Sequence, residues 1–351
     1  MRDLYPVSTR SPVYDEIRAV VMYALTGRYV RSVHREEVLP GPQPHTLKTS
    51  TFCAEVCKEG AFWVSEKTHG ERFVCVKRNG ACYLVNRCMQ VYTTCADDVS
   101  KCATLTATLG GVAAKSRVMK NTTVIDGELV RLPRGDPSSG EYRYFAFDAM
   151  MSNGELLISE SYERRYSELS SAVADIPFAA RKRAVSVAAV GWVLRGIERR
   201  GNAYFRVWRN DRGIVERAVP CDGLVFVANE GGYRAAIYKW KPRLHNTVDF
   251  AVQFCTRKAG MVNLQVCADR GERITVRSVE GSATVWGKFK DGDVVECAYD
   301  EARGTWVPLR ARHDKHRPNY IGVFVATMEV LAENLSESRL VQLSSANTAA
   351  R

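Results

Sequence analysis

Hydrophobic and polar positions predict one helix near the start of this 351-residue chain and a series of strands after it. Apolar residues recur at helical spacing over 13–27 (VYDEIRAVVMYALTG), and Gly27 can end that helix. The proline-rich stretch LPGPQPHTL at 39–47 predicts a loop. Beyond this loop, apolar runs bounded by turn residues predict the strands FWVSEK, RFVCVK, CYLVNR, TTVIDGELVRL, YRYFAFDAMM and LVFVAN.

The pattern changes near residue 243. The runs TVDFAVQFC, MVNLQVCAD, RITVRSV, ATVWGKF and DVVECAYD predict short strands with turns between them, which favours a small all-β barrel of the OB type. Residues 154–175 with the basic stretch after them, and residues 323–336, are predicted to be helical. The tail SSANTAAR is predicted to be disordered.

These patterns predict an α+β protein of two domains. The first, residues 1–242, combines antiparallel sheets with flanking helices, and the second, residues 243–322, is an OB-fold β-barrel. Residues 323–351 would form a C-terminal helix and the disordered tail. No apolar run is long enough to span a membrane and the N-terminus lacks the apolar core of a signal peptide, so we expect a soluble, intracellular protein with no membrane partner.

Charge and cysteine usage narrow the choice of partner and compartment. The chain has 50 Lys and Arg against 39 Asp and Glu, a formal net charge of +11, which suits a polyanion such as nucleic acid or a nucleotide. The eleven cysteines form no paired CxxC clusters, which indicates free thiols in a reducing compartment. Cys53 and Cys57 have the spacing of a zinc half-site, but no second half follows.

Common catalytic signatures are absent from the sequence, including a P-loop, a GxGxxG fingerprint and HExxH. Instead, six short polar motifs follow one another in the predicted strands. Each motif alone is explained by an ordinary hairpin or strand end, so their information lies in the order. They are EKTHGER at 66–72, IDGELV at 125–130, YFAFD at 144–148, DGLVF at 222–226, YKWKP with NTVDF at 238–250, and WVPLRARHDK with PN at 306–319.

This ordered set resembles the covalent nucleotidyltransferase superfamily and, within it, the mRNA capping guanylyltransferases. Those proteins carry KxDGxR, DGE, an aromatic strand ending in FD, EGxV, KWKP leading into NTVDF, and RxRxDKxxPN. The resemblance covers about residues 60–320. The KWKP…NTVDF and RxRxDK…PN pieces are the most specific, and they favour capping enzymes over DNA and RNA ligases.

The resemblance implies that Lys67 attacks GTP, releases pyrophosphate and carries GMP, which then passes to the 5′-diphosphate end of an RNA to form a GpppN cap. An uncharged lysine is the nucleophile that this phosphoramidate chemistry needs. Positive side chains would position the phosphates, because the leaving pyrophosphate carries heavy charge. Lys239 and Lys241 would bind the α-phosphate, and the clamp on the β- and γ-phosphates would consist of Arg310, Arg312 and Lys315.

Further site roles also come from the resemblance. Glu128 and Asp222 would hold a divalent cation, Mg²⁺ or Mn²⁺, since hard cations prefer carboxylates. Arg72 would contact the ribose and Thr68 the guanine. The same carry-over adds Asp314 to the catalytic residues and adds Arg87 and Phe147 to the GTP site.

The implied partners are GTP, 5′-diphosphate RNA, a separate RNA triphosphatase, a separate cap methyltransferase and RNA polymerase. The implied location is the nucleus, or a cytoplasmic replication site if the protein is viral.

Two positions depart from the family pattern. His69 stands where the family has Asp, and Asp222 replaces Glu. The loss of a carboxylate beside the nucleophile leaves open an altered metal or pH dependence, or an inactive copy. Two other hypotheses also stay open: an ATP-dependent polynucleotide ligase that shares the Lys67 chemistry, and a non-catalytic module of the same fold that binds RNA or polymerase.

Overall fold

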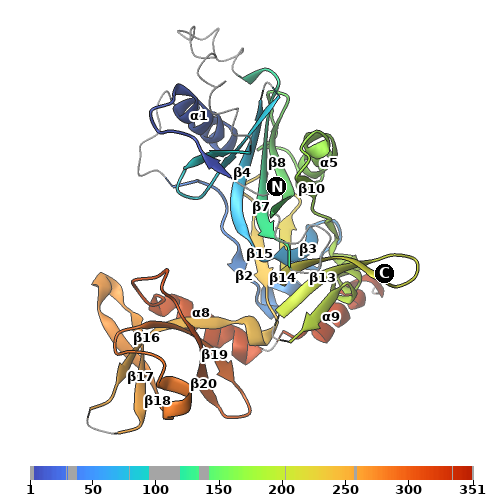
Figure 1. Ribbon diagram of the computed structural model, residues 1–351. Coiled ribbons are helices and arrows are strands. Elements are labelled where there is room, and N and C mark those ends of the chain that lie inside the picture. The colour runs from blue at the N-terminus through green and yellow to red at the C-terminus, as the bar shows by residue number, and fades with distance from the viewer. Residues whose placement is uncertain are drawn as a thin grey trace. The chain divides into compact units, whose positions relative to one another are not determined.

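The described residues of the computed structural model fall into two compact units, which are treated separately here (Figure 1). Unit 1 comprises Met1–His45, Phe52–Lys239 and Val341–Arg351, and unit 2 comprises Thr46–Thr51 and Trp240–Leu340. The structure describes residues 4–28, 30, 38–78, 80–94, 119–133, 142–201, 203–256, 259–333 and 335–349.

The first sheet of unit 1 has eight strands within the described ranges, in the order β1-β6-β5-β4-β7-β8-β10 with β9 paired to β8. The β8–β10 pair is parallel, and the other pairs are antiparallel. The strands are β1 (Tyr5–Pro6), β4 (Glu71–Arg78), β5 (Ala81–Val85), β6 (Val91–Thr93), β7 (Thr122–Arg131), β8 (Tyr142–Ser152), β9 (Glu155–Leu156) and β10 (Ala179–Arg181).

The second sheet of unit 1 carries the first motif. Its order is β11-β3-β14-β13-β12, and β15 joins β14 to β2. The strands are β2 (His45–Thr46), β3 (Phe62–Thr68), β11 (Val185–Ser186), β12 (Ile197–Arg200), β13 (Ala203–Arg209), β14 (Val215–Ala228) and β15 (Ile237–Trp240). The helical segments of unit 1 are α1 (Pro12–Thr26), η1 (Phe52–Val56), α5 (Tyr162–Ala174), η3 (Val187–Ala189) and α6 (Val190–Arg195). Helix α2 (Thr49–Thr51) belongs to unit 2, and α9 (Glu337–Ala349) begins in unit 2 and continues into unit 1 from Val341.

The first sheet is buried on both faces, which explains the continuous apolar run of β4. Val74 and Val76 belong to a core shared with α1, whereas Phe73 and Cys75 belong to a core shared with α5. Successive side chains of a strand point to opposite faces, so a strand covered on both sides needs apolar residues at every position. Helix α1 lies along one side of this sheet and α5 along the other (Figure 1).

Unit 2 is an antiparallel sheet of five strands among its described residues, in the order β18-β17-β16-β19-β20. Strand β17 alternates between buried and half-buried positions, the pattern of a sheet with one apolar face. Its core includes Phe250, Leu264, Trp286, Trp306 and Leu331. The elements are η4 (Arg243–His245), β16 (Thr247–Phe254), β17 (Met261–Cys267), η5 (Asp269–Gly271), β18 (Arg273–Glu280), α7 (Ala283–Trp286), β19 (Val294–Asp300), β20 (Thr305–Ala311) and α8 (Ile321–Glu333).

Most predicted elements are confirmed, but the barrel is not. The described residues contain no pairing between β18 and β20, so the sheet of unit 2 is open. Strand β18 exposes Arg273, Arg277 and Glu280 at the edge of the sheet. Charged side chains along an edge strand discourage further pairing, which accounts for the open edge.

Three local predictions were wrong. The segment ATVWGKF forms the single-turn helix α7, because this turn places Trp286 in the core of unit 2. Residues 154–175 are helical only from Tyr162; Glu155 and Leu156 form β9 after a turn at Asn153 and Gly154, and the basic stretch joins β8 as β10. The tail predicted to be disordered continues α9 to Ala349, since the helix is anchored by buried Leu340 and Ser344.

The central stretch of unit 1 ends at Lys239, and the long stretch of unit 2 begins at Trp240, beside the predicted boundary at 242. Within the described ranges, the structure holds no helix long and apolar enough to cross a membrane.

Gly127, in the IDGELV motif, is required by packing against Tyr144. A Cβ at Gly127 would lie 2.4 Å from Cζ of Tyr144. The buried Tyr144 hydroxyl donates to the carbonyls of Phe73 at 2.9 Å and Ile125 at 3.0 Å, so its ring has no room to move.

We therefore expect Gly127→Ala to lower the free energy of unfolding by about 1–3 kcal/mol, the usual cost of overpacking. Urea titration measures this loss. In a double-mutant cycle, Tyr144→Leu should make Gly127→Ala nearly neutral. Additive losses in the double variant would show that the Gly127–Tyr144 contact is not the cause.

Candidate functional site

Lys67 lies near the end of β3 and contacts Asp222 on the neighbouring strand β14. The Nζ of Lys67 is 2.8 Å from Oδ1 of Asp222. The β3–β14 register is irregular here: Cys221 pairs with Thr68, but the next pair is Leu224 with Glu66. Two residues of β14 thus face one of β3, and such a bulge re-aims a side chain. The bulge directs Asp222 at Lys67, whose side chain stays 23% exposed and therefore reachable.

The residues that follow Lys67 are tied to Glu128 of β7. The Thr68 hydroxyl donates to one carboxylate oxygen of Glu128, and the Gly70 backbone N–H donates to the other at 3.0 Å. Thr68 is completely buried. Glu128 therefore links the turn after β3 to the first sheet, and it lies beside the nucleophile strand as the metal hypothesis requires.

Arg72 is held by two groups that the sequence analysis did not select. Its Nε and Nη2 donate to the two oxygens of Asp126 at 3.0 and 2.7 Å, and Nη2 also donates to the Tyr233 hydroxyl at 2.8 Å. The Tyr233 hydroxyl in turn donates to Asp126 at 2.6 Å. Burial lowers the pKa of Arg72, but the charges and hydrogen bonds of Asp126 and Tyr233 together outweigh it and raise the pKa overall. The guanidinium is fixed in position and remains charged.

Lys182 is a buried cation beside the site, and the sequence did not identify it as a site residue. Its Nζ donates to Thr68 Oγ1 at 3.4 Å and lies 5.9 Å from the ring centroid of Phe147. Backbone contacts fix it, because its N–H donates to Ala146 and its carbonyl accepts from the Tyr166 hydroxyl. Only the parallel pairing of β10 with β8 brings Lys182 here, and its neighbours Arg181 and Arg183 gave it the appearance of an exposed basic run.

Glu66, on the face of β3 that also carries Thr68, completes this buried environment. Burial raises the pKa of Glu66, while the charges of Lys182 and Arg206 oppose that rise. Cys221, opposite Thr68, has a pKa raised to about 12 by burial. The Cys221 thiol is therefore protonated at neutral pH and is not a nucleophile.

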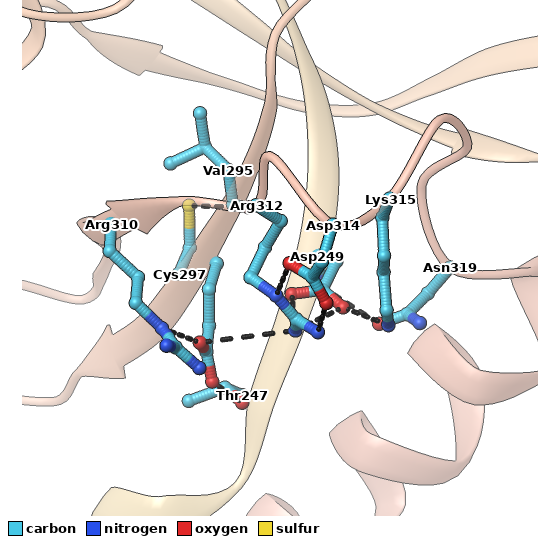
Figure 2. Close-up of polar contacts among 10 residues, drawn as sticks. Thr247, Asp249, Val295, Cys297, Arg310, Arg312, Asp314, Lys315 and Asn319 are labelled. Atoms are coloured by element: carbon cyan, nitrogen blue, oxygen red, sulfur yellow. Dashed lines mark hydrogen bonds and ion pairs between the residues drawn. The ribbon is translucent and has the colours of Figure 1, made fainter. Parts of the chain in front are cut away.

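In unit 2, the C-terminal basic motif converges on one carboxylate, that of Asp249 in β16 (Figure 2). Arg312 Nη1 lies 3.0 Å from both oxygens of Asp249, and Lys315 Nζ lies 2.5 Å from one of them. Asn319 accepts from the Asp249 backbone N–H at 2.8 Å and donates its own N–H back to the Asp249 carbonyl at 2.8 Å. Asp249 is 5% exposed, so its carboxylate contacts Arg312 and Lys315 from a buried position.

Glu296 and Asp314 complete the cluster of unit 2. Glu296 accepts from Arg310 at 2.7 Å and from Thr247 at 2.9 Å, and Asp314 pairs with Arg312 at 2.8 Å (Figure 2). Burial raises the pKa of Glu296, but hydrogen bonds from Arg310 and Thr247 outweigh it and lower the pKa overall. Three cations thus face three carboxylates: Arg310, Arg312 and Lys315 against Asp249, Glu296 and Asp314.

Other predicted site residues lie on nearby elements. Lys239 is in β15, which is hydrogen-bonded to the Asp222 strand β14. Lys241 follows β15 and belongs to unit 2. Arg87 lies in the turn between β5 and β6 with an exposed side chain, and its carbonyl accepts from the Leu39 N–H at 2.9 Å.

Metal-binding clusters are absent in the part of the chain that the structure describes, where no three His, Cys, Asp or Glu side chains gather. Cys53 and Cys57 are not joined by a disulfide, and the Cys57 thiol donates to the Cys53 carbonyl at 3.4 Å. Glu128 and Asp222 offer two carboxylates, which fits Mg²⁺ or Mn²⁺, since such ions take one or two carboxylates and complete their shell with substrate phosphates and water.

Comparison with known proteins gives two adjoining family matches. Residues 25–243 match the mRNA capping enzyme catalytic domain, and residues 245–341 match the mRNA capping enzyme C-terminal domain. The mRNA-capping enzyme subunit alpha of Kluyveromyces lactis is 20% identical, over 90% of this chain and 79% of that protein. The mRNA-capping enzyme of Caenorhabditis elegans is 21% identical over 88% of this chain. The chain spans 49% of the worm protein's length.

Among solved structures, a mycobacterial DNA ligase D complexed with ATP and MES is 15% identical, with a TM-score of 0.40. The match covers 81% of this chain and 97% of the ligase chain.

The Glu296 contacts make the local stability of unit 2 depend on pH. A carboxyl group whose pKa is lowered by folding adds stability above its ordinary pKa of 4.5 and loses it as the pH falls through the lower folded value. We expect amide hydrogen exchange in β19 to lose protection as the pH drops below 4.5.

In Glu296→Gln, this acid-dependent loss should shrink, and protection at pH 7 should be lower than in the wild type. Glu280→Gln, at the exposed end of β18, is the matched control and should leave the pH profile unchanged. An identical acid profile in Glu296→Gln and the wild type would contradict the assignment.

Proposed function

Because this chain belongs to the mRNA capping enzyme family, we propose that it is an mRNA guanylyltransferase in which Lys67 carries the GMP. The observation that supports the role of Lys67 is its 2.8 Å contact with Asp222, made by the irregular register of β3 and β14. A reachable lysine oriented by a carboxylate on a rigid strand is suited to nucleophilic attack.

The reaction proceeds in two balanced steps. The neutral amine of Lys67 attacks the α-phosphorus of GTP, so that an N–P bond forms, the bond to the β-phosphate oxygen breaks, pyrophosphate leaves, and the proton lost from the nitrogen passes to solvent. An oxygen of the RNA 5′-diphosphate then attacks the same phosphorus. The N–P bond breaks, the Lys67 nitrogen takes up a proton from solvent to recover its amine, and the RNA gains a GpppN end.

Lys182 supports the choice of guanine over adenine. Guanine presents the acceptors O6 and N7 on one edge, whereas adenine presents an amino donor in place of O6. A lysine ammonium only donates, so Lys182, beside Thr68, suits guanine and disfavours adenine. Phe147 lies next to the same ammonium and supplies a ring for base contact.

The phosphate and ribose roles remain proposals based on the family motifs. Arg72 would contact the ribose, and its fixed guanidinium supports that role. Arg87 would be a further GTP contact. Lys239 and Lys241 would bind the α-phosphate. A divalent cation held by Glu128 and Asp222 would neutralise phosphate charge. The β- and γ-phosphates would be bound by Arg310, Arg312 and Lys315, with Asp314 orienting Arg312.

For unit 2 we propose an OB-type fold. Its meander β16–β17–β18, the helix α7 before β19, and the pairing of β19 with β16 give the strand order of a five-stranded Greek-key sheet. The proposed partners are 5′-diphosphate RNA, a separate RNA triphosphatase, a separate cap methyltransferase and RNA polymerase, and the proposed location is the nucleus.

The decisive test is covalent labelling with α-³²P-GTP or α-³²P-ATP and Mg²⁺ or Mn²⁺, followed by denaturing electrophoresis. We expect an acid-labile band from GTP alone that disappears with added pyrophosphate. Lys67→Ala should abolish it, and Lys120→Ala, at an exposed lysine, should leave it unchanged. A band from ATP alone would indicate a ligase, and no band from either nucleotide would indicate a binding module.

A second test concerns the guanine site. The wild type should use GTP better than 2-aminopurine riboside triphosphate, which lacks O6, by about ten- to a hundred-fold in kcat/KM, the usual effect of one hydrogen bond to a charged group. Lys182→Met should lose this discrimination, with thermal melting as the check of folding. Arg181→Met, at the exposed neighbouring position, should retain it. Undiminished discrimination in Lys182→Met would remove Lys182 from the guanine site.

A further inference from the structure

The positive charge of the chain is concentrated in one segment. Residues 176–217 hold ten Lys and Arg and three acidic residues, a net charge of +7 out of the total of +11. Two of the ten, Lys182 and Arg206, are buried in the interior of unit 1. The remaining eight cations and three acids give the surface of this segment a net charge of +5.

The fold places this segment on both sides of the Lys67 strand. Strand β11 pairs with β3 on one side, and β14, β13 and β12 follow one another on the other side. Neighbouring strands lie about 4.8 Å apart, so β12 lies about 14 Å from β3 within the same sheet. A stacked nucleic-acid strand advances about 3.4 Å per nucleotide, so about four nucleotides span that distance.

The outer part of the segment, which we call the β12–β14 basic surface, consists of Arg199, Arg200, Arg209, Arg212 and Arg217. Arg199, Arg200 and Arg212 are exposed. Glu198 contacts both Arg200 and Arg209, and Asp211 and Glu216 are the other acidic residues of this stretch. The five cations of this surface therefore outnumber the three carboxylates.

Aromatic rings lie beside cations of residues 176–217, within the β12–β14 basic surface at Phe205 and outside it at Trp192. The guanidinium of Arg200 lies 5.5 Å from the ring centroid of Phe205, and that of Arg183 lies 4.2 Å from the ring centroid of Trp192. Phe205, Trp192 and Tyr204 are all partly exposed. Single-stranded nucleic acids are bound by this combination, in which cations follow the backbone and rings stack on the bases.

We propose that the β12–β14 basic surface binds the first several nucleotides of the acceptor RNA and directs its 5′ end toward Lys67. This inference rests on the proposed function. An RNA fits better than an acidic peptide, because the partly exposed rings of Tyr204 and Phe205 can stack on bases and because the acceptor must approach the strand that carries Lys67. Binding by backbone charge and stacking does not depend on base sequence, as a site acting on many transcripts requires.

The test compares two triple variants that lose equal charge. Arg199→Gln/Arg200→Gln/Arg212→Gln removes three exposed cations from the surface, and Arg10→Gln/Arg28→Gln/Lys58→Gln removes three exposed cations elsewhere in unit 1. Binding of a 3′-fluorescein-labelled ten-nucleotide 5′-diphosphate RNA is measured from 50 to 300 mM KCl. GMP transfer is measured with the same RNA and with its two-nucleotide form.

For the first variant we expect a reduction in the slope of log K against log salt of about 2, since each neutralised phosphate of a single strand contributes about 0.7. The KM for the ten-nucleotide RNA should rise about ten-fold toward that of the two-nucleotide RNA, with adduct formation from GTP unchanged. The control variant should match the wild type.

Equal losses of RNA binding in both variants would show that binding depends on total charge rather than on this surface, and would overturn the proposal. An unchanged slope in the first variant would also overturn it, as would a phosphorylated acidic peptide of equal charge that binds the surface and displaces the RNA. Absence of the GMP adduct in the wild type would instead contradict the proposed function. RNA binding would still report on the surface in that case.

Discussion

The pairing of β3 with β14 is the constraint on which the site depends. A regular ladder would set one residue of β14 opposite Lys67, but the bulge sets Asp222 and Gly223 there and aims a carboxylate at the amine. The same ladder continues as Leu224 with Glu66 and Val225 with Ser65, so Lys67 is positioned by a strand buried in a core rather than by a loop. Because a strand transmits its register along its whole length, packing far from Lys67 determines where its amine lies.

A second principle recurs in both units: several of the cations proposed to bind substrate are already held by a carboxylate. Lys67 contacts Asp222 in unit 1, and Arg312 contacts Asp249 in unit 2. Such pairs keep long side chains ordered before substrate arrives, which reduces the entropy lost on binding. They also mean that a phosphate gains affinity only by exchanging with a carboxylate, so binding depends on the difference between two ionic contacts. The exchange favours triphosphate, whose several oxygens compete for a cation that one carboxylate holds.

The sequence predicted the strands and the order of the motifs, because both depend on local patterns. The two buried faces of β4 and the alternation of β17 can be predicted from such patterns. Contacts between segments that lie far apart in the chain could not be predicted from them. Lys182 joins the Thr68 environment only through a parallel strand that the basic composition concealed, and Glu296 is one polar position in an apolar strand. The prediction for the α7 segment was wrong for a related reason: five residues between Gly281 and Gly287 carry too little periodicity to separate a turn of helix from a strand.

The net charge of +11 has a different meaning once its members are placed. Arg72, Arg312 and Lys182 act in enclosed surroundings, where each has its own partner, and they contribute little to the field outside the protein. Arg199 and Arg200 of β12 and Arg209 of β13 are exposed, so long-range attraction of a polyanion arises from them. The enclosed cations are therefore suited to a bound nucleotide, and the exposed ones to a polymer. The exposed arginines lie on the same sheet as Lys67, so under the proposed function the polymer would approach the strand that carries this lysine.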